Sequence, residues 1–393
     1  MRLVEVNTPD TAKQFIQVNY LLQKDDPNYI RPLNKDIATV FDPQKNKAFR
    51  HGEVARWILK DNNNNLIGRI AAFVNSRYKN KGDTIPVGGM GFFECINNQE
   101  AANLLLDTAK TWLQQKGMEA MDGPINFGER DRWWGLLVEG FTPPVYGLNY
   151  NPPYYQQLLE HYGFKPFFNQ VCFALDAGKP LQEKFFTRHA DIAADENFSA
   201  THIQRNHIEK FASDFATVYN KAWAGHGGIK QLDEKVVINM FNTMKPVLDE
   251  RICWFAYYKN EPIAIWINLP DLNQWFKYLN GKFGIWQKLY FLWIKLTRRN
   301  KKFTGLVFGV VPEFQGKGVD AYIIVEGSKV IQSLQADGSI GKPIYDEYEM
   351  QWIGEFNPKM ISVAESLGTY RSRKLVTYRY MFDTTIHPMH PTL

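Results

Sequence analysis

The sequence predicts an α/β fold of the α+β kind, in which two successive domains each have a mixed central sheet flanked by helices. The chain has 393 residues, about twice the size of a common domain. Segments with strand and helix patterns alternate in both halves. One pattern also recurs: at 151–163 and again at 357–368, Asn-Pro opens a short helix whose Glu lies three residues before a closing Gly. This recurrence indicates a duplication.

Composition argues against several classes of protein. The 46 basic and 41 acidic side chains give a formal net charge of +5, whereas nucleic-acid binders typically have a stronger, clustered excess, so no nucleic-acid partner is expected. Cys95, Cys172 and Cys253 are widely spaced and fit neither a disulfide framework nor a zinc pattern. We therefore expect no metal, and a reducing compartment.

Two features of the chain bear on its location. Residues 1–15 lack the apolar stretch of a signal peptide. The apolar stretch 283–296 is interrupted by Gln287, Lys288 and Lys295 and is shorter than the roughly 20 residues that span a membrane. We expect a cytoplasmic protein, attached at most peripherally to the inner membrane.

The first half, 1–176, has the elements of one domain. Apolar arms at 53–59 and 66–75 flank the turn-forming segment 61–65 and predict a strand pair. Further strands are predicted at 87–95 and near 118–121. Apolar residues at helical spacing predict helices at 99–116 and 154–162, ending at Gly117 and Gly163.

The stretch 177–198, with Gly178, Pro180 and mixed charges, is typical of a linker. The second predicted domain, 199–393, repeats the order of the first. Its predicted helices are 208–223, 234–248, 319–334 and 359–367, and its predicted strands are 252–258, 263–269, 305–311, 347–353 and 374–382.

The segment 306–320 is the most informative about chemistry, because a strand breaks at Pro312 into a glycine-bearing turn and continues as a helix. Gly316 and Gly318 would let the backbone approach a ligand closely, and amides at a helix N-terminus supply positive potential. A diphosphate is the natural occupant of such a turn. A tight strand-to-helix connection without a ligand is the alternative.

This segment resembles the acyl-CoA signature of the GNAT superfamily of acyltransferases, Gln/Arg-x-x-Gly-x-Gly/Ala after a strand. Gln315 and Gly318 match it, whereas Asp320 stands where Gly or Ala is expected. A carboxylate there would repel phosphates, unless it turned away to cap helix amides. The resemblance implies acyl-CoA as the donor substrate, with Val310, Val311, Gln315, Gly316, Lys317, Gly318, Val319 and Asn357 around it.

The resemblance is incomplete in two places. The tyrosine acid that the family carries in its later helix is missing, since 363–368 contains no tyrosine. The first half has Ile96-Asn97-Asn98-Gln99-Glu100 where the phosphate loop would be, with no glycine. It therefore looks like a degenerate GNAT domain that supports the second domain or shapes an acceptor pocket.

Short segments along most of the chain are similar to the bacterial ceramide synthase-like branch of this superfamily. That similarity implies N-acylation of a long-chain, sphingoid-type amino alcohol by a fatty acyl thioester. The segments are 68–72, 91–94, 122–124, 135–141, 219–223, 355–360 and 378–380.

Acylation of an amine needs a base with a pKa near neutrality. Glu355, just past a predicted strand, is the first candidate, with a loop cap or ion pair as the alternative. His226 lies in a glycine-rich loop and titrates in the right range, although a loop histidine is commonly without function. Glu349 is the third candidate, and with Glu347 it makes one strand face acidic, as a solvated face also would.

The segment 281–302 predicts a basic amphipathic helix. Its apolar face has Trp286, Leu289, Tyr290, Trp293 and Leu296, while Phe291 falls on the polar side. Such a helix is typical of peripheral membrane contact or of a lipid-chain tunnel. A helix packed on the protein's own core is the alternative.

The leading hypothesis is an acyl-CoA-dependent N-acyltransferase whose second half binds the donor. One alternative is an aminoacyl-tRNA-dependent transferase of the same fold, which the small net charge and the lack of a long basic arm disfavour. The other is a non-catalytic lipid- or protein-binding module, which Asp320 and the missing tyrosine favour.

Overall fold

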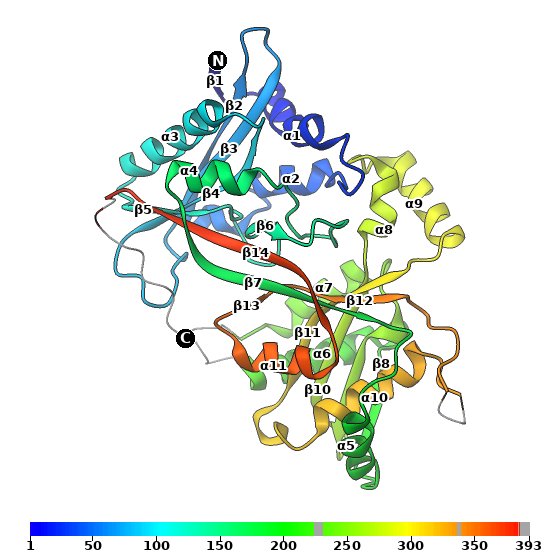
Figure 1. Cartoon of the computed structure of the whole chain (residues 1–393). Coiled ribbons are helices and arrows are strands. Elements are labelled where there is room, and N and C mark those ends of the chain that lie inside the picture. The colour runs from blue at the N-terminus through cyan, green and yellow to red at the C-terminus, as the bar shows by residue number, and fades with distance from the viewer. Residues whose placement is uncertain (224–230, 336–338, 384, 386–393) are drawn as a thin grey trace.

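The computed structural model describes residues 1–223, 231–335, 339–383 and 385. Figure 1 shows one long sheet running through both halves of the molecule, with helices packed on its faces. Within the described ranges the sheet has 14 strands, in the order β1-β2-β3-β4-β5-β14-β7-β12-β11-β10-β9-β8, with β6 beside β14 and β13 beside β7. Both parallel and antiparallel pairs occur, so the predicted mixed sheet is confirmed.

The first half supplies the elements up to the centre of the sheet. They are β1 (Arg2–Glu5), α1 (Pro9–Gln23), α2 (Asn34–Val40), β2 (Gly52–Lys60), β3 (Leu66–Asn75), β4 (Val87–Cys95), α3 (Gln99–Gln115), β5 (Ala120–Gly123), β6 (Leu136–Glu139), α4 (Tyr155–Tyr162) and β7 (Lys165–Asp176).

The second half supplies the rest. Its elements are α5 (Glu183–Ala193), β8 (Phe198–His202), α6 (Ile208–Trp223), α7 (Glu234–Met244), β9 (Trp254–Tyr258), β10 (Glu261–Pro270), α8 (Asn273–Phe276), α9 (Ile285–Thr297), β11 (Lys302–Val310), α10 (Val319–Ile331), β12 (Glu347–Met350), β13 (Ile353–Gly354), α11 (Pro358–Ser366) and β14 (Tyr370–Met381).

Most predicted elements lie where the hydrophobic patterns put them, and β4 and α6 begin and end at the predicted residues. Several elements were not predicted. They include the helix α1, the long strand β7 and the helix α5, which lies inside the segment interpreted as a linker. Phe185 is the one buried side chain that α5 contributes, so its sequence has little apolar periodicity. The boundaries of the two domains stay a prediction.

The two halves exchange their last strands. β14 follows α11 of the second half but pairs with β5 of the first, while β7 ends the first half and pairs with β12 of the second. The two long strands also pair with each other. As a result, Val376 and Tyr378 of β14 belong to the core of the first half, and Val171 and Phe173 of β7 belong to the core of the second.

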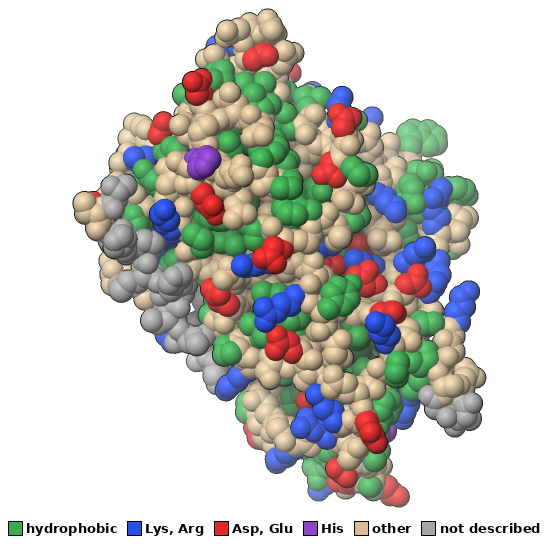
Figure 2. All heavy atoms as spheres, viewed as in Figure 1, with side chains coloured by type: hydrophobic (Ala, Val, Ile, Leu, Met, Phe, Trp, Pro, Cys, Tyr) green, Lys and Arg blue, Asp and Glu red, His purple; other side chains and the backbone are tan. Residues whose placement is uncertain are grey.

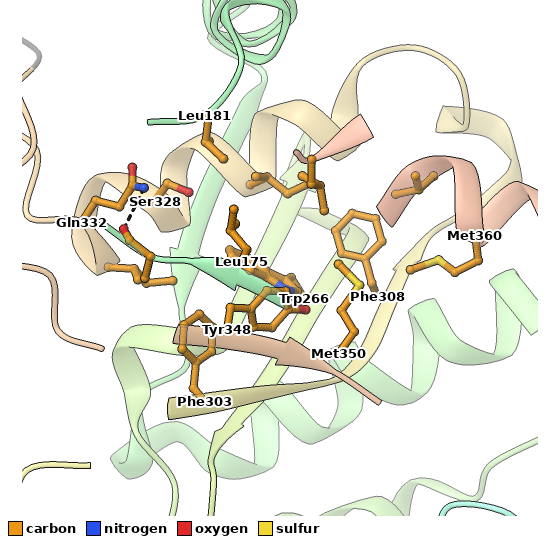
Figure 3. Close-up of a pocket in the computed structure, with 15 residues that line it drawn as sticks. Leu175, Leu181, Trp266, Phe303, Phe308, Ser328, Gln332, Tyr348, Met350 and Met360 are labelled. Atoms are coloured by element: carbon orange, nitrogen blue, oxygen red, sulfur yellow. Dashed lines mark hydrogen bonds between the residues drawn. The ribbon is translucent and has the colours of Figure 1, made fainter. Parts of the chain in front are cut away.

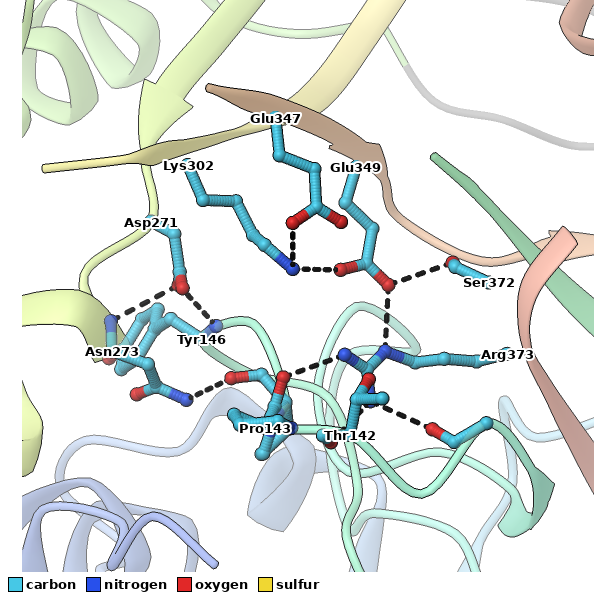
Figure 4. Close-up of polar contacts among 12 residues, drawn as sticks. Thr142, Pro143, Tyr146, Asp271, Asn273, Lys302, Glu347, Glu349, Ser372 and Arg373 are labelled. Carbon is cyan, nitrogen blue, oxygen red and sulfur yellow. Dashed lines mark hydrogen bonds and ion pairs between the residues drawn. The ribbon is translucent and has the colours of Figure 1, made fainter. Parts of the chain in front are cut away.

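Buried ion pairs hold this crossing together, as Figure 4 shows. Arg373 of β14 donates from Nε to Glu349 of β12 at 2.7 Å. Its remaining nitrogens donate to the carbonyls of Thr142 at 2.7 Å and Pro143 at 2.6 Å. Lys302 of β11 lies 2.9 Å from the second Glu349 oxygen. Every charge in this network therefore has a partner, as burial requires.

A carboxylate beside this network also joins the halves. Asp271, which follows β10, accepts hydrogen bonds from the backbone amides of Tyr146 at 2.9 Å and Asn273 at 3.1 Å. Burial raises the pKa of Asp271 to about 6, and these hydrogen bonds and the charge of Lys302 offset only part of that rise.

We predict that Arg373→Ala strongly destabilises the fold, because Glu349 would keep a buried charge without its main partner. The free energy of unfolding should fall by about 3–5 kcal/mol. Lys374→Ala is the control, since Lys374 is partly exposed and lies 3.7 Å from Glu139. It should cost less than about 1 kcal/mol. Urea unfolding measures both variants, and equal losses would contradict the role given to Arg373.

We predict that Asp271→Asn stabilises the protein more at pH 7.5 than at pH 4. Because the folded-state pKa lies above the unfolded value near 3.9, the folded chain binds more protons between these pH values, and stability falls as pH rises through this window. The difference between the variant and the natural chain should grow by up to about 3 kcal/mol across it. Urea unfolding at both pH values measures this, and a difference that does not change with pH would rule out the assignment.

Candidate active site

The candidate site lies where two neighbouring parallel strands separate. β11 and β12 pair from Lys302 and Glu347 up to Gly305 and Met350, and the pairing stops there. Beyond Gly305, β11 continues to Val310 and into the turn that begins α10. The separation leaves room between the strands beneath α10 and α11.

An apolar cavity fills this room. It measures about 620 Å³ including its open mouth, and its walls come from β7, β10, β11, β12, α10 and α11. Figure 3 shows it as elongated, with Phe308, Met350 and Met360 at one end and Ser328 and Gln332 at the other. The lining is almost entirely aliphatic and aromatic, which suits a hydrocarbon ligand.

One glycine shapes the floor of the cavity. A Cβ added at Gly305 would lie 2.1 Å from the hydroxyl oxygen of Tyr348, so a larger residue would displace that ring. The Tyr348 hydroxyl in turn lies 3.4 Å from Trp266 Nε1, and the two rings pack edge to face. The floor is thus built from two large aromatic side chains that sequence patterns alone did not connect.

The turn before α10 presents free backbone donors. Gly316 and Gly318 have φ values of 73° and 88°, a conformation that favours glycine, and Gly318 is the N-cap of α10 with no side chain to cap the helix. Gln315 donates from Nε2 to the carbonyl of Val310 at 2.9 Å, which ties the turn to its strand. Between described residues, the amides of Gly316, Lys317, Gly318 and Val319 make no hydrogen bond. They remain available to an anion.

In the first half the helix at the equivalent position, α3, has a side-chain cap at its N-terminus. The Asn98 side chain accepts a hydrogen bond from the amide of Ala101 at 2.8 Å and so caps α3. An amide that already has a partner cannot hold a phosphate. The start of α3 thus has a capping side chain, whereas the turn before α10 has glycines and no side-chain cap.

The unpredicted helix α5 packs along α10 and reaches this turn. Backbone and Cβ atoms of Arg188 lie 3.6–3.7 Å from the position that a Cβ of Gly318 would take. Arg188 is exposed and adds a positive charge beside the turn, while the partly buried Asp320 adds a negative one. Sequence patterns gave no indication of the proximity of α5 to the turn, because it depends on tertiary packing.

Two of the residues expected near the donor have structural partners. The amide of Val311 donates to the carbonyl of Ile263 on β10 at 2.9 Å. Asn357 caps α11, since its side chain accepts from the amide of Met360 at 3.2 Å. Asn357 therefore positions the helix that carries Met360 into the cavity wall.

The three candidate bases differ in their surroundings. Burial alone would raise the pKa of Glu349, but Arg373 and Lys302 outweigh it and hold the pKa below its ordinary value, so this carboxylate stays ionised as part of the buried network. Glu355 is exposed, and its two oxygens accept from the backbone amide of Asn169 at 2.9 Å and its Nδ2 at 2.7 Å. His226 lies outside the residues that the structure describes.

A second cavity, of about 820 Å³ including its mouth, lies in the first half beyond the point where β4 and β5 stop pairing. Glu94 lines it and accepts from Tyr155 at 2.9 Å and Gln23 at 2.8 Å. Burial raises the pKa of Glu94 even though Arg69 lies 3.3 Å away. Sequence analysis missed this site, and its available signal was a pair of charged residues inside two apolar strands.

Comparison with solved structures identifies the fold. The chain aligns over 97% of its length with 99% of a tandem GNAT protein from the clavulanic acid biosynthesis pathway, with a TM-score of 0.53 and 11% identity. The chain has the GNAT fold, twice in tandem. A glucosamine N-acetyltransferase region related to GCN5, from a fungal multi-domain protein, aligns over 96% of the chain and 38% of that protein, with a TM-score of 0.51 and 11% identity. The predicted GNAT fold is confirmed.

Two curated proteins resemble the chain over most of their lengths. The bacterial ceramide synthase of Caulobacter vibrioides (strain NA1000 / CB15N) is 25% identical over 384 residues, which cover 94% of this chain and 96% of that protein. Protein YghO of Escherichia coli (strain K12) is 25% identical over 369 residues, covering 91% and 89%. No family model matches. The resemblance to the bacterial ceramide synthase-like branch that the short segments indicated is confirmed.

Proposed function

We propose that this GNAT-fold chain is an N-acyltransferase that moves an acyl group from acyl-CoA to an amine. The supporting observation is that a single helix, α10, has both features that such a donor would need. Its N-terminus carries the free amides of the 316–319 turn, and its later turns bring Ile324, Ser328 and Ile331 into the apolar cavity. A diphosphate at the turn and a hydrocarbon chain in the cavity would therefore lie along one element.

The depth of the cavity favours a long acyl chain. Ser328 lies ten residues beyond Gly318, about 15 Å along the helix axis, and Gln332 lies a further turn away. The end near Phe308, Met350 and Met360 lies where the strands separate, and Ser328 and Gln332 at the other end are buried. Each methylene buried there contributes about 0.8 kcal/mol, so affinity should rise with chain length.

The proposed reaction is the transfer of an acyl group between two nucleophiles. The amine nitrogen attacks the thioester carbonyl, a C–N bond forms, the C–S bond breaks, and the proton lost by the amine passes through a base to the thiolate. Glu355 is the base that we propose, because its carboxylate is exposed, is oriented by Asn169, and lies in the chain between the cavity residues Met350 and Met360. Glu349 is excluded from this role by its buried partners.

The acceptor that we propose is a long-chain, sphingoid-type amino alcohol. The supporting observation is the likeness, over nearly the whole of both chains, to a protein named bacterial ceramide synthase. A non-catalytic lipid-binding module with the same donor cavity is the second candidate, favoured by the use of Glu349 and Asn357 in structural bonds.

We predict that Gly316→Ala weakens coenzyme A binding about tenfold or more. A Cβ at this position would crowd the anion, and the free amides could no longer reach it. Gly117→Ala is the matched control, because Gly117 has a φ of 76° against 73° for Gly316 and neither added Cβ meets an atom within 4 Å. Both variants should lose a similar stability of about 1–2 kcal/mol. Calorimetric titration with coenzyme A measures the affinities, and equal affinities would contradict a site at the turn.

We predict that Ser328→Phe changes the chain-length preference of the enzyme. The natural chain should release free thiol faster from palmitoyl-CoA than from acetyl-CoA in the presence of a sphingoid-type amine. The added ring fills the Ser328 end of the cavity, so turnover with palmitoyl-CoA should fall at least about tenfold while acetyl-CoA is still used. The variant should also lose about 1–3 kcal/mol of stability. An unchanged preference would place the acyl chain elsewhere. Binding of palmitoyl-CoA with no thiol release by the natural chain would favour the non-catalytic module.

A further inference from the structure

The helix α9 exposes an unusually apolar surface. Of the fourteen large hydrophobic side chains that are exposed in the described part of the chain, half lie on this helix of 13 residues. Their exposed fractions run from 40% to 86%, so water reaches most of this face. The seven exposed side chains of α9 are Ile285, Trp286, Leu289, Tyr290, Leu292, Trp293 and Leu296. Apolar patches of this kind mark contact surfaces.

The exposed face is distinct from the face that anchors the helix. Phe291 and Ile294 are buried in a small cluster with Trp275, Phe276 and Leu33. Phe291, which the helical wheel assigned to the polar side, is thus one of the residues that hold α9 on the protein. The helix therefore packs on the protein's own core, but it does so through Phe291 and Ile294, and the face with Trp286, Leu289 and Leu296 stays exposed.

The segment around this face is strongly basic. Residues 281–302 contain no acidic residue and have seven basic ones, Lys282, Lys288, Lys295, Arg298, Arg299, Lys301 and Lys302. Lys282, Lys288 and Lys301 are exposed, and their ammonium groups form no hydrogen bond or ion pair with another described residue. Figure 2 shows the apolar side chains projecting at this edge of the molecule with Lys and Arg beside them.

We infer that α9 docks the protein on an anionic lipid surface, with its apolar face in the boundary between head groups and acyl chains. Tryptophan and leucine on one face and lysine around it are the composition of helices that lie in a membrane interface. A second copy of the chain is a poorer occupant, because a symmetric dimer would bring the same basic segment of each copy against the other. Among the described helices none is long and apolar enough to cross a membrane, so α9 lies on the surface.

The position of α9 relates this surface to the donor cavity. The helix ends at Thr297, and β11 begins five residues later at Lys302. Phe303, the next residue, lines the cavity. A membrane-bound α9 would therefore hold the wall of the cavity close to the lipid surface. The inference itself depends on the exposed face and its charges, and it stands whether or not the chain transfers acyl groups.

Sedimentation with lipid vesicles tests the inference on the full chain. We expect binding to phosphatidylcholine vesicles that contain 30% phosphatidylglycerol and at least tenfold weaker binding to phosphatidylcholine alone. The triple variant Trp286→Ser, Leu289→Ser, Leu296→Ser should bind the anionic vesicles at least tenfold more weakly, because it removes apolar area from the exposed face only. Val236→Ser, Met240→Ser is the matched control, since these side chains of α7 are 51% and 40% exposed, and its binding should be unchanged.

The melting temperatures of both variants are measured in parallel, and they should stay near that of the natural chain because every replaced side chain is exposed. Three results would overturn the inference. The first is failure of the natural chain to sediment with anionic vesicles. The second is sedimentation of the triple variant as well as the natural chain. The third is light scattering that shows a dimer which the triple variant alone disrupts.

Discussion

The structure depends on burying charges where the two halves exchange strands. Removing Arg373, Lys302 and Glu349 from water costs several kcal/mol for each ion, and their pairing at 2.7 and 2.9 Å offsets that cost. Because these side chains come from β14, β11 and β12, the pairing fixes the strands relative to one another. Arg379, which is also on β14, ties this strand to β5 in the same way, since it donates to Asp122 of β5 at 2.6 Å. The separation of β11 from β12, and with it the apolar cavity, is positioned by this network.

The two halves show how one fold can give two kinds of site. Both have parallel strands that stop pairing and a cavity just beyond. In the second half a glycine N-cap leaves amides free and the cavity is apolar, whereas in the first half Asn98 occupies the helix end and Glu94 and Arg69 make the cavity polar. Phe92 and Trp133, which line the polar cavity, have positive φ values of 50° and 46°. Such strain, of order 1 kcal/mol or more for each residue, persists where surrounding structure enforces it.

Local sequence patterns predicted most helices and strands here, because periods of 2 and 3.6 follow from backbone geometry. They did not predict which strands pair, since β14 meets β5 across more than 240 residues of chain. A period also reveals two faces without saying which one is buried. Glu349 was therefore interpreted on a solvated or catalytic face although it is fully buried. The glycine turn before α10 was predictable because it needs only glycines and a helix start, whereas the capping role of Asn357 depends on where its side chain turns.

The helix α9 is a second case in which the hydrophobic period did not say which face is buried. The wheel separated Phe291 from the larger apolar face, and the sequence left open whether the helix meets a membrane or packs on the protein's own core. The protein buries the smaller face and leaves the larger one in water. This arrangement forgoes a stabilisation of about 25 cal/mol for each Å² of apolar surface that stays exposed. A soluble fold gains nothing from that arrangement, so the exposed face needs an apolar partner. The basic residues around it select an anionic one, and of the surfaces available to a protein, a lipid bilayer offers both properties at once.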